Sequence, residues 1–134
     1  MSGVETWIEV SKLKEGSYIM VDNEPCRVVS ISKSKPGKHG AAKARIVAIG
    51  LFDGQKRTII KSTADRLPVP TILKREGEII NISGNEIEVM DSETYETVTL
   101  RVPDQWKDKI SIGRRIEFWI VAGRPLFVAV KRER

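Results

Sequence analysis

The alternation of apolar and polar residues predicts a protein made almost entirely of short β-strands. Residues 85–90 place Glu between aliphatic side chains, and residues 97–100 alternate between Thr and an aliphatic side chain. Such alternation is typical of a strand with one face in a core and the other in water. Residues 116–121 and 126–130 are nearly continuous apolar runs, which predicts more deeply buried strands.

Strands are predicted wherever β-branched runs are bounded by turn-forming Gly, Asn, Asp or Pro. The predicted strands are 17–22, 26–34, 41–50, 56–62, 71–82, 85–91, 95–102, 115–122 and 124–131. Residues 103–110 break the alternation and predict one short helix, with Asp104 as its cap and Trp106 and Ile110 on one face. An oligonucleotide-binding (OB) type barrel has a short helix at this place between strands.

Two prolines, Pro68 and Pro70, predict a stiff linker near the middle of the chain, because proline denies hydrogen bonds to a strand ladder. The balance of charge changes at the same place. We therefore predict an all-β fold of two small barrels, residues 1–68 and 69–134, with at most one short helix in the second.

The net charge of +5 is concentrated in the first half of the chain. Residues 1–68 carry 12 Lys and Arg against 7 Asp and Glu, whereas residues 69–134 carry 11 of each. Between Glu24 and Asp53 there is no acid at all. This window contains Arg27, Lys33, Lys35, Lys38, Lys43 and Arg45. A patch of one sign suits a polyanion, most simply nucleic acid, although a solvated basic face is the alternative.

Several functional classes are excluded by composition. No stretch approaches the length of a membrane span, and the N-terminus lacks an apolar secretory core, so we expect a cytoplasmic protein. Cys26 is the only cysteine and His39 the only histidine. No metal site is patterned, and Cys26 is expected to be a small buried residue of a strand.

The loop between the strands predicted at 26–34 and 41–50 contains the most informative residues. Gly37 and Gly40 allow the chain to reverse on both sides of Lys38 and His39, and Pro36 stiffens the approach. Residues 32–40 include no large apolar side chain. We therefore expect this loop to present Lys38 to solvent.

Lys38 has three other interpretations. A phosphate-binding loop requires a Gly five positions before the Gly-Lys pair and a Ser or Thr after it; Ser32 and His39 stand there instead. A catalytic lysine requires a pKa lowered by burial or by close cations, and an exposed tip gives little lowering. An ordinary exposed hairpin is not excluded by composition.

The loop sequence resembles the hypusine loop of the translation initiation factor 5A family in its archaeal form. The resembling segment is Ser34-Lys35-Pro36-Gly37-Lys38-His39-Gly40, and the likeness extends through residues 9–18 and 24–29 to essentially the whole chain. Pro36 and Ala41 differ from the usual eukaryotic loop. The resemblance implies an SH3-like N-terminal barrel and an OB-type C-terminal barrel, and relates the chain to bacterial elongation factor P.

The resemblance also implies the function. Lys38 would receive an aminobutyl group from spermidine through deoxyhypusine synthase, giving deoxyhypusine or hypusine, with no other cofactor bound. The factor, not itself an enzyme, would bind the ribosomal exit site beside peptidyl-tRNA and relieve stalling at consecutive prolines. Lys35, Pro36, Gly37, His39 and Gly40 would support the modification.

The basic strands beside the loop suggest contacts with RNA. The candidates are Arg27, Lys33, Lys43 and Arg45. One alternative function is a general RNA-binding module acting off the ribosome. Another is a self-assembling relative without the modified lysine, and the intact Lys38 motif argues against it. We expect a monomer, with weak dimerisation left open.

Overall fold

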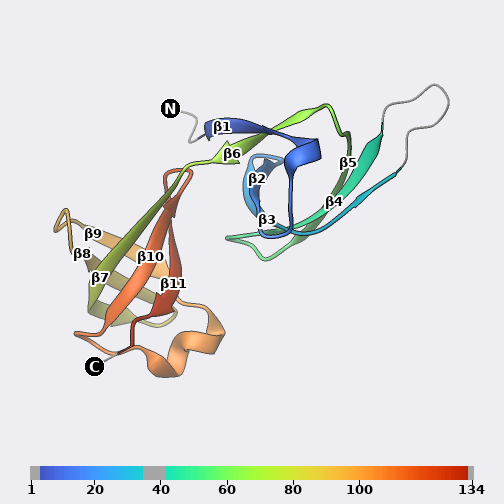
Figure 1. The fold of residues 1–134 in the computed structure, drawn as a ribbon. Coiled ribbons are helices and arrows are strands. Elements are labelled where there is room, and N and C mark those ends of the chain that lie inside the picture. The colour runs from blue at the N-terminus through green and yellow to red at the C-terminus, as the bar shows by residue number, and fades with distance from the viewer. Residues whose placement is uncertain (1–3, 35–41, 133–134) are drawn as a thin grey trace. The chain divides into compact units, whose positions relative to one another are not determined.

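Alternating segments form β-strands throughout the residues that the structure, a computed structural model, describes: 4–34 and 42–132. The described residues contain eleven strands and two 3₁₀ helices (Figure 1). The chain divides into two units, Met1–Thr71 and Ile72–Arg134. The all-β fold predicted from the sequence is confirmed.

The first unit combines a four-stranded sheet with a two-stranded ribbon. Its elements are β1 (Val4–Glu9), η1 (Val10–Lys12), β2 (Tyr18–Val21), β3 (Glu24–Lys33), β4 (Lys43–Gly50), β5 (Lys56–Ser62) and β6 (Arg66–Pro70). Strands β2, β3, β4 and β5 pair in chain order as an antiparallel meander, and β1 pairs with β6. Strand β6 also contacts β2, so the ribbon and the sheet enclose one core as a small barrel.

The core of the first unit is formed by the inward side chains of the meander and of the ribbon. On β4, Ala44, Ile46 and Ala48 are buried and alternate with residues of the opposite face. Cys26 is fully buried in the same core, as the sequence predicts, and burial raises the pKa of its thiol. A buried thiol with a raised pKa is a poor nucleophile.

The second unit is a five-stranded barrel. Its elements are β7 (Ile72–Ser83), β8 (Glu86–Asp91), β9 (Thr97–Arg101), η2 (Asp104–Lys109), β10 (Arg115–Val121) and β11 (Arg124–Val130). The strand order is β11-β10-β7-β8-β9, and the edge strands β9 and β11 contact each other, which closes the sheet. Trp106 of η2 packs on the core, with its ring centroid 6.0 Å from that of Phe127.

Two details of the sequence prediction are wrong. The expected linker is strand β6, where Pro68 pairs with Trp7 and Pro70 with Val4. A strand that pairs on one side alone tolerates proline, because the position of the missing N–H group can lie on the unpaired side. Asp104 is not the cap of the short helix: the cap position is Pro103, and Asp104 instead pairs with Lys107 at 2.8 Å.

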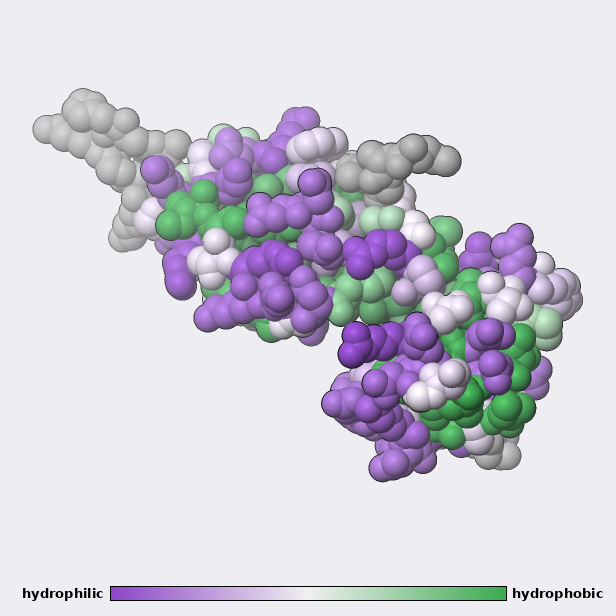
Figure 2. Space-filling model, turned by 180° about the vertical axis from the view of Figure 1, so that it is seen from behind, coloured by the Kyte–Doolittle hydropathy of each residue, from purple (hydrophilic) through white to green (hydrophobic). Residues whose placement is uncertain are grey.

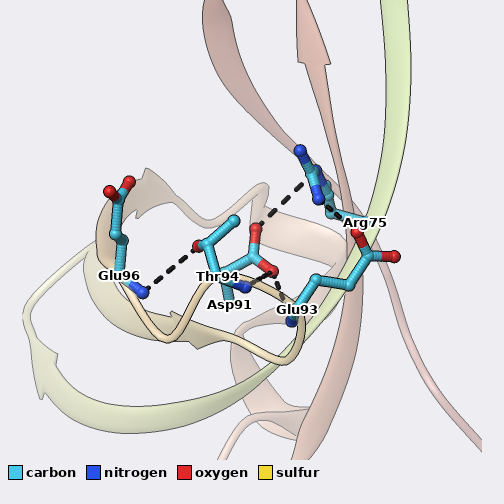
Figure 3. A network of polar contacts seen from close by, with 5 residues as sticks. All are labelled: Arg75, Asp91, Glu93, Thr94 and Glu96. Atoms are coloured by element: carbon cyan, nitrogen blue, oxygen red, sulfur yellow. Dashed lines mark hydrogen bonds and ion pairs between the residues drawn. The ribbon is translucent and has the colours of Figure 1, made fainter.

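One buried carboxylate organises the turn between β8 and β9 (Figure 3). Asp91 Oδ1 accepts hydrogen bonds from the backbone N–H groups of Glu93 at 2.8 Å and Thr94 at 3.2 Å. Asp91 Oδ2 lies 3.7 Å from Arg75 Nε, and Arg75 also pairs with Glu93. Asp91 is the buried charged residue of the described chain, so the turn and β7 are held together by a carboxylate shielded from water.

At the turn between β4 and β5, Asp53 forms two hydrogen bonds with Arg57, at 2.7 and 3.1 Å. These bonds and the backbone N–H of Gln55 lower the pKa of Asp53 to about 2. Such a bidentate pair fixes the direction in which the chain enters β5.

Among the described residues, no helix has the length and apolar character that a membrane span requires.

We predict that Asp91→Ala destabilises the second unit by about 1–3 kcal/mol, because two backbone donors and Arg75 lose a buried acceptor. Chemical denaturation followed by circular dichroism measures the change. Asp104→Ala removes a carboxylate of an exposed ion pair and serves as the control, with little effect expected. Equal stability of Asp91→Ala and wild type would contradict this role.

We predict that Arg57→Gln raises the pKa of Asp53 from about 2 towards its ordinary value. The folded-state pKa of Asp53 is below its unfolded value, so its stabilising contribution is complete above about pH 4 and is lost as the pH falls towards 2. NMR titration of the Asp53 carboxyl carbon measures this in both proteins. An unchanged midpoint in Arg57→Gln would show that Arg57 is not the cause.

Candidate nucleic-acid interface and modification loop

Strands β3 and β4 hold the root of the predicted modification loop. The Ser34 N–H donates to the Lys43 carbonyl at 2.8 Å, and the Lys43 N–H donates to Ser34 Oγ at 3.3 Å. On the other side, the Thr63 N–H donates to the Ala42 carbonyl at 2.9 Å. Both ends of the loop therefore start from backbone that is fixed by hydrogen bonds.

The residues predicted to carry or support the modification lie outside the described residues. They are Lys35, Pro36, Gly37, Lys38, His39 and Gly40. Their roles stay predictions. The described residues nearest to them are Ser34 and Ala42, at the two ends of the loop.

The antiparallel register places three of the four candidate RNA contacts on one face of the first unit's sheet. On β4, Lys43, Arg45, Val47 and Ile49 point away from the core, because they alternate with the buried Ala44, Ile46 and Ala48. Arg27 pairs with Ile49 and therefore shares their face. We call this side of β3, β4 and β5 the outer face.

The outer face consists of four rows across the three strands. From the loop root downwards the rows are Ser34–Lys43–Ser62, Ser32–Arg45–Ile60, Ser30–Val47–Thr58 and Arg27–Ile49–Lys56. Its cations Arg27, Lys43, Arg45 and Lys56 are all exposed. Lys56 is not among the RNA contacts predicted from the sequence. The alternation of β5, combined with the turn at residues 52–55, is the signal that would have found it.

Lys33 lies on the opposite side from the other candidates. It pairs with Ala44, whose side chain points into the core, and its Nζ donates to the Ser11 carbonyl at 2.8 Å. The reason is a β-bulge between Val28 and Ser30, which inserts one extra residue into β3. In a regular strand Arg27 and Lys33 would share a face; the bulge separates them.

A hollow of about 290 Å³ opens at the loop root. It is lined by Ser32, Lys33, Ser34, Lys43, Ala44, Arg45 and Ile60. Five of these residues have a hydroxyl group or a positive charge, but most of the surface that lines the hollow is apolar. Among the described residues there is no cluster of three or more His, Cys, Asp or Glu that could hold a metal ion.

Comparison with known proteins gives relatives over the whole chain. A family model described as "Translation initiation factor 5A-like, N-terminal" matches residues 5–65. The translation initiation factor 5A of Archaeoglobus fulgidus is 51% identical over 81% of this chain and 85% of its own length. That of Pyrococcus horikoshii is 44% identical over 98% of both chains.

The fold has a matching solved structure. The protein described as eukaryotic translation initiation factor 5A from Methanococcus jannaschii superposes with a TM-score of 0.90 at 38% identity, covering 98% of this chain and 97% of its own. Identity at this level over nearly full length, in sequence and in fold, is decisive: the chain belongs to the translation initiation factor 5A family, in its archaeal form.

Proposed function

We propose that this translation factor binds the ribosomal exit site beside peptidyl-tRNA and promotes peptide-bond formation at stalled sequences, such as consecutive prolines. The active group would be a hypusine or deoxyhypusine at Lys38. The observation that carries the proposal is the fixed root at Ser34, Lys43 and Ala42, from which the Lys35-Pro36-Gly37-Lys38-His39-Gly40 motif begins. Membership of the family supports the same role in translation.

The proposed modification changes the reach and charge of one side chain. Deoxyhypusine synthase, an NAD-using partner, would add the aminobutyl group of spermidine to Lys38. The product is longer than lysine and has a second protonatable nitrogen, which suits a pocket lined by RNA. The factor would accelerate the reaction by orienting the tRNA substrate, without forming or breaking bonds itself.

The outer face would place the first unit against RNA backbone. Arg27, Lys43 and Arg45 share this face with Lys56, and contacts to phosphates position a protein without reading sequence. Lys33 is the weaker candidate, since its ammonium group is bound to the Ser11 carbonyl. We propose that the protein acts in the cytoplasm as a monomer.

The second candidate function is a general RNA-binding module acting off the ribosome. The same cations support it, because contacts to phosphates do not require a ribosome. It differs in one respect that can be measured: its RNA affinity would not depend on the modification of Lys38.

We predict that Lys38→Arg keeps the fold and the net charge but prevents modification and abolishes stall rescue. Intact-mass analysis after incubation with deoxyhypusine synthase, spermidine and NAD should show one added aminobutyl group on wild type and none on the variant. Translation of a polyproline reporter measures rescue. Full rescue by Lys38→Arg would refute the proposal. If the protein did not bind the ribosome, and its modified and unmodified forms bound RNA equally well, the general RNA-binding module would be favoured.

We predict that Arg45→Gln weakens ribosome binding and lowers the slope of log affinity against log salt by about 1, as for loss of one phosphate contact. Lys61→Gln is the matched control, because Lys61 pairs with Ala44 and lies on the side opposite Arg45. Binding is measured by cosedimentation over a range of salt concentrations. Equal slopes for the two variants would remove Arg45 from the interface.

A further inference from the structure

An aliphatic stripe crosses the outer face and is not explained by RNA binding. Ile60 of β5 is 64% exposed and Ile49 of β4 is 38% exposed, although both lie in well-paired strands. Val47 lies in the row between them on the same face but is only 8% exposed, so the stripe is exposed at its two ends. The three side chains form a diagonal that begins one row below the loop root.

Cations and hydroxyl groups surround this stripe. Arg45 lies beside Ile60, Lys56 and Arg27 lie on either side of Ile49, and Ser30 and Thr58 flank Val47. The only acid in β3, β4 and β5 is Glu24. Glu24 is two residues before the buried Cys26 and so shares the core-facing side of the strand. The charged side chains of these three strands that lie on the outer face are therefore all positive.

RNA alone does not account for this composition. Sheets that bind single-stranded RNA stack bases on aromatic side chains. Strands β3, β4 and β5 contain no aromatic residue, and the one aromatic residue of this sheet, Tyr18 of β2, pairs with Arg27 in the row farthest from the loop root. Isoleucine side chains gain nothing from contact with phosphates. Exposed aliphatic side chains flanked by polar groups are instead typical of a protein–protein interface.

We propose that the outer face is the docking site for the enzyme that extends Lys38, and that this enzyme presents an apolar centre ringed by carboxylates. The inference rests on the proposed function, because it requires that Lys38 be modified. An enzyme acting on Lys38 has to approach the loop root, and Ile60 lines the hollow at that root. Burial of Ile60 and Ile49 supplies affinity, while Arg45, Arg27 and Lys56 orient the enzyme electrostatically.

The test is the kinetics of Lys38 modification, followed by intact mass. The double variant Ile49→Ser/Ile60→Ser should raise KM for the protein substrate about tenfold, with kcat within about twofold. The reason is that removal of two aliphatic groups that docking would bury weakens binding and leaves the chemistry intact. Ile112→Ser in the second unit is the matched control, since Ile112 is 65% exposed. It should behave as wild type.

A binding measurement that needs no turnover accompanies the kinetics. Lys38→Arg protein cannot be modified and should compete with wild type for the enzyme. The same protein with Ile49→Ser/Ile60→Ser should compete about tenfold more weakly. Thermal unfolding by circular dichroism verifies that each variant is folded, and Ile60→Ser alone replaces the double variant if the double variant unfolds.

Each other outcome overturns the inference in a distinguishable way. If wild type is modified and the isoleucine variants keep its KM and its competing strength, the docking site is elsewhere, and the proposed function stands. If the isoleucine variants lose RNA affinity as strongly as Arg45→Gln, the stripe belongs to an RNA interface. If wild type is not modified, the proposed function fails and the inference fails with it.

Discussion

The β-bulge between Val28 and Ser30 decides what the first unit presents to its partners. Before the bulge, Cys26 and Val28 point into the core; after it, Ile31 does. The extra residue keeps apolar side chains in the core while the strand bends. After it, each side chain of β3 lies on the opposite side of the sheet from the one it would have in a regular strand. As a result Ser32 joins Arg45 on the outer face, and Lys33 turns to the Ser11 carbonyl.

The bulge also determines how the loop root is built. The register after it brings Ser34 opposite Lys43, where backbone and hydroxyl hydrogen bonds close the hairpin. Strand β5 continues the ladder beyond β4, and Thr63 holds Ala42 from the other side. A loop that starts from backbone fixed on two sides loses less entropy when a partner binds it than one on a free ribbon. Such a root would favour the proposed presentation of Lys38 to a partner.

The outer face has two kinds of side chain, cations and exposed aliphatic residues, which suit different partners. Its cations suit phosphates and carboxylates alike, whereas Ile49 and Ile60 favour only an apolar protein surface. A factor that is first a substrate and then a ribosomal ligand would have to serve both in turn. The second unit has a different organisation, in which the buried Asp91 and Arg75 stabilise the turn after β8.

The sequence by itself determined most strands, the short helix at Trp106, the burial of Cys26 and the acid-free window around the loop. These follow from local alternation and composition, which need no knowledge of distant residues. Tertiary structure alone decided that Pro68 and Pro70 belong to a strand, because pairing with β1 is a long-range contact. It also decided that Lys33 faces away from Arg45, because the bulge in β3 depends on its pairing with β4. The face of a side chain is fixed only when the partner strands set the register.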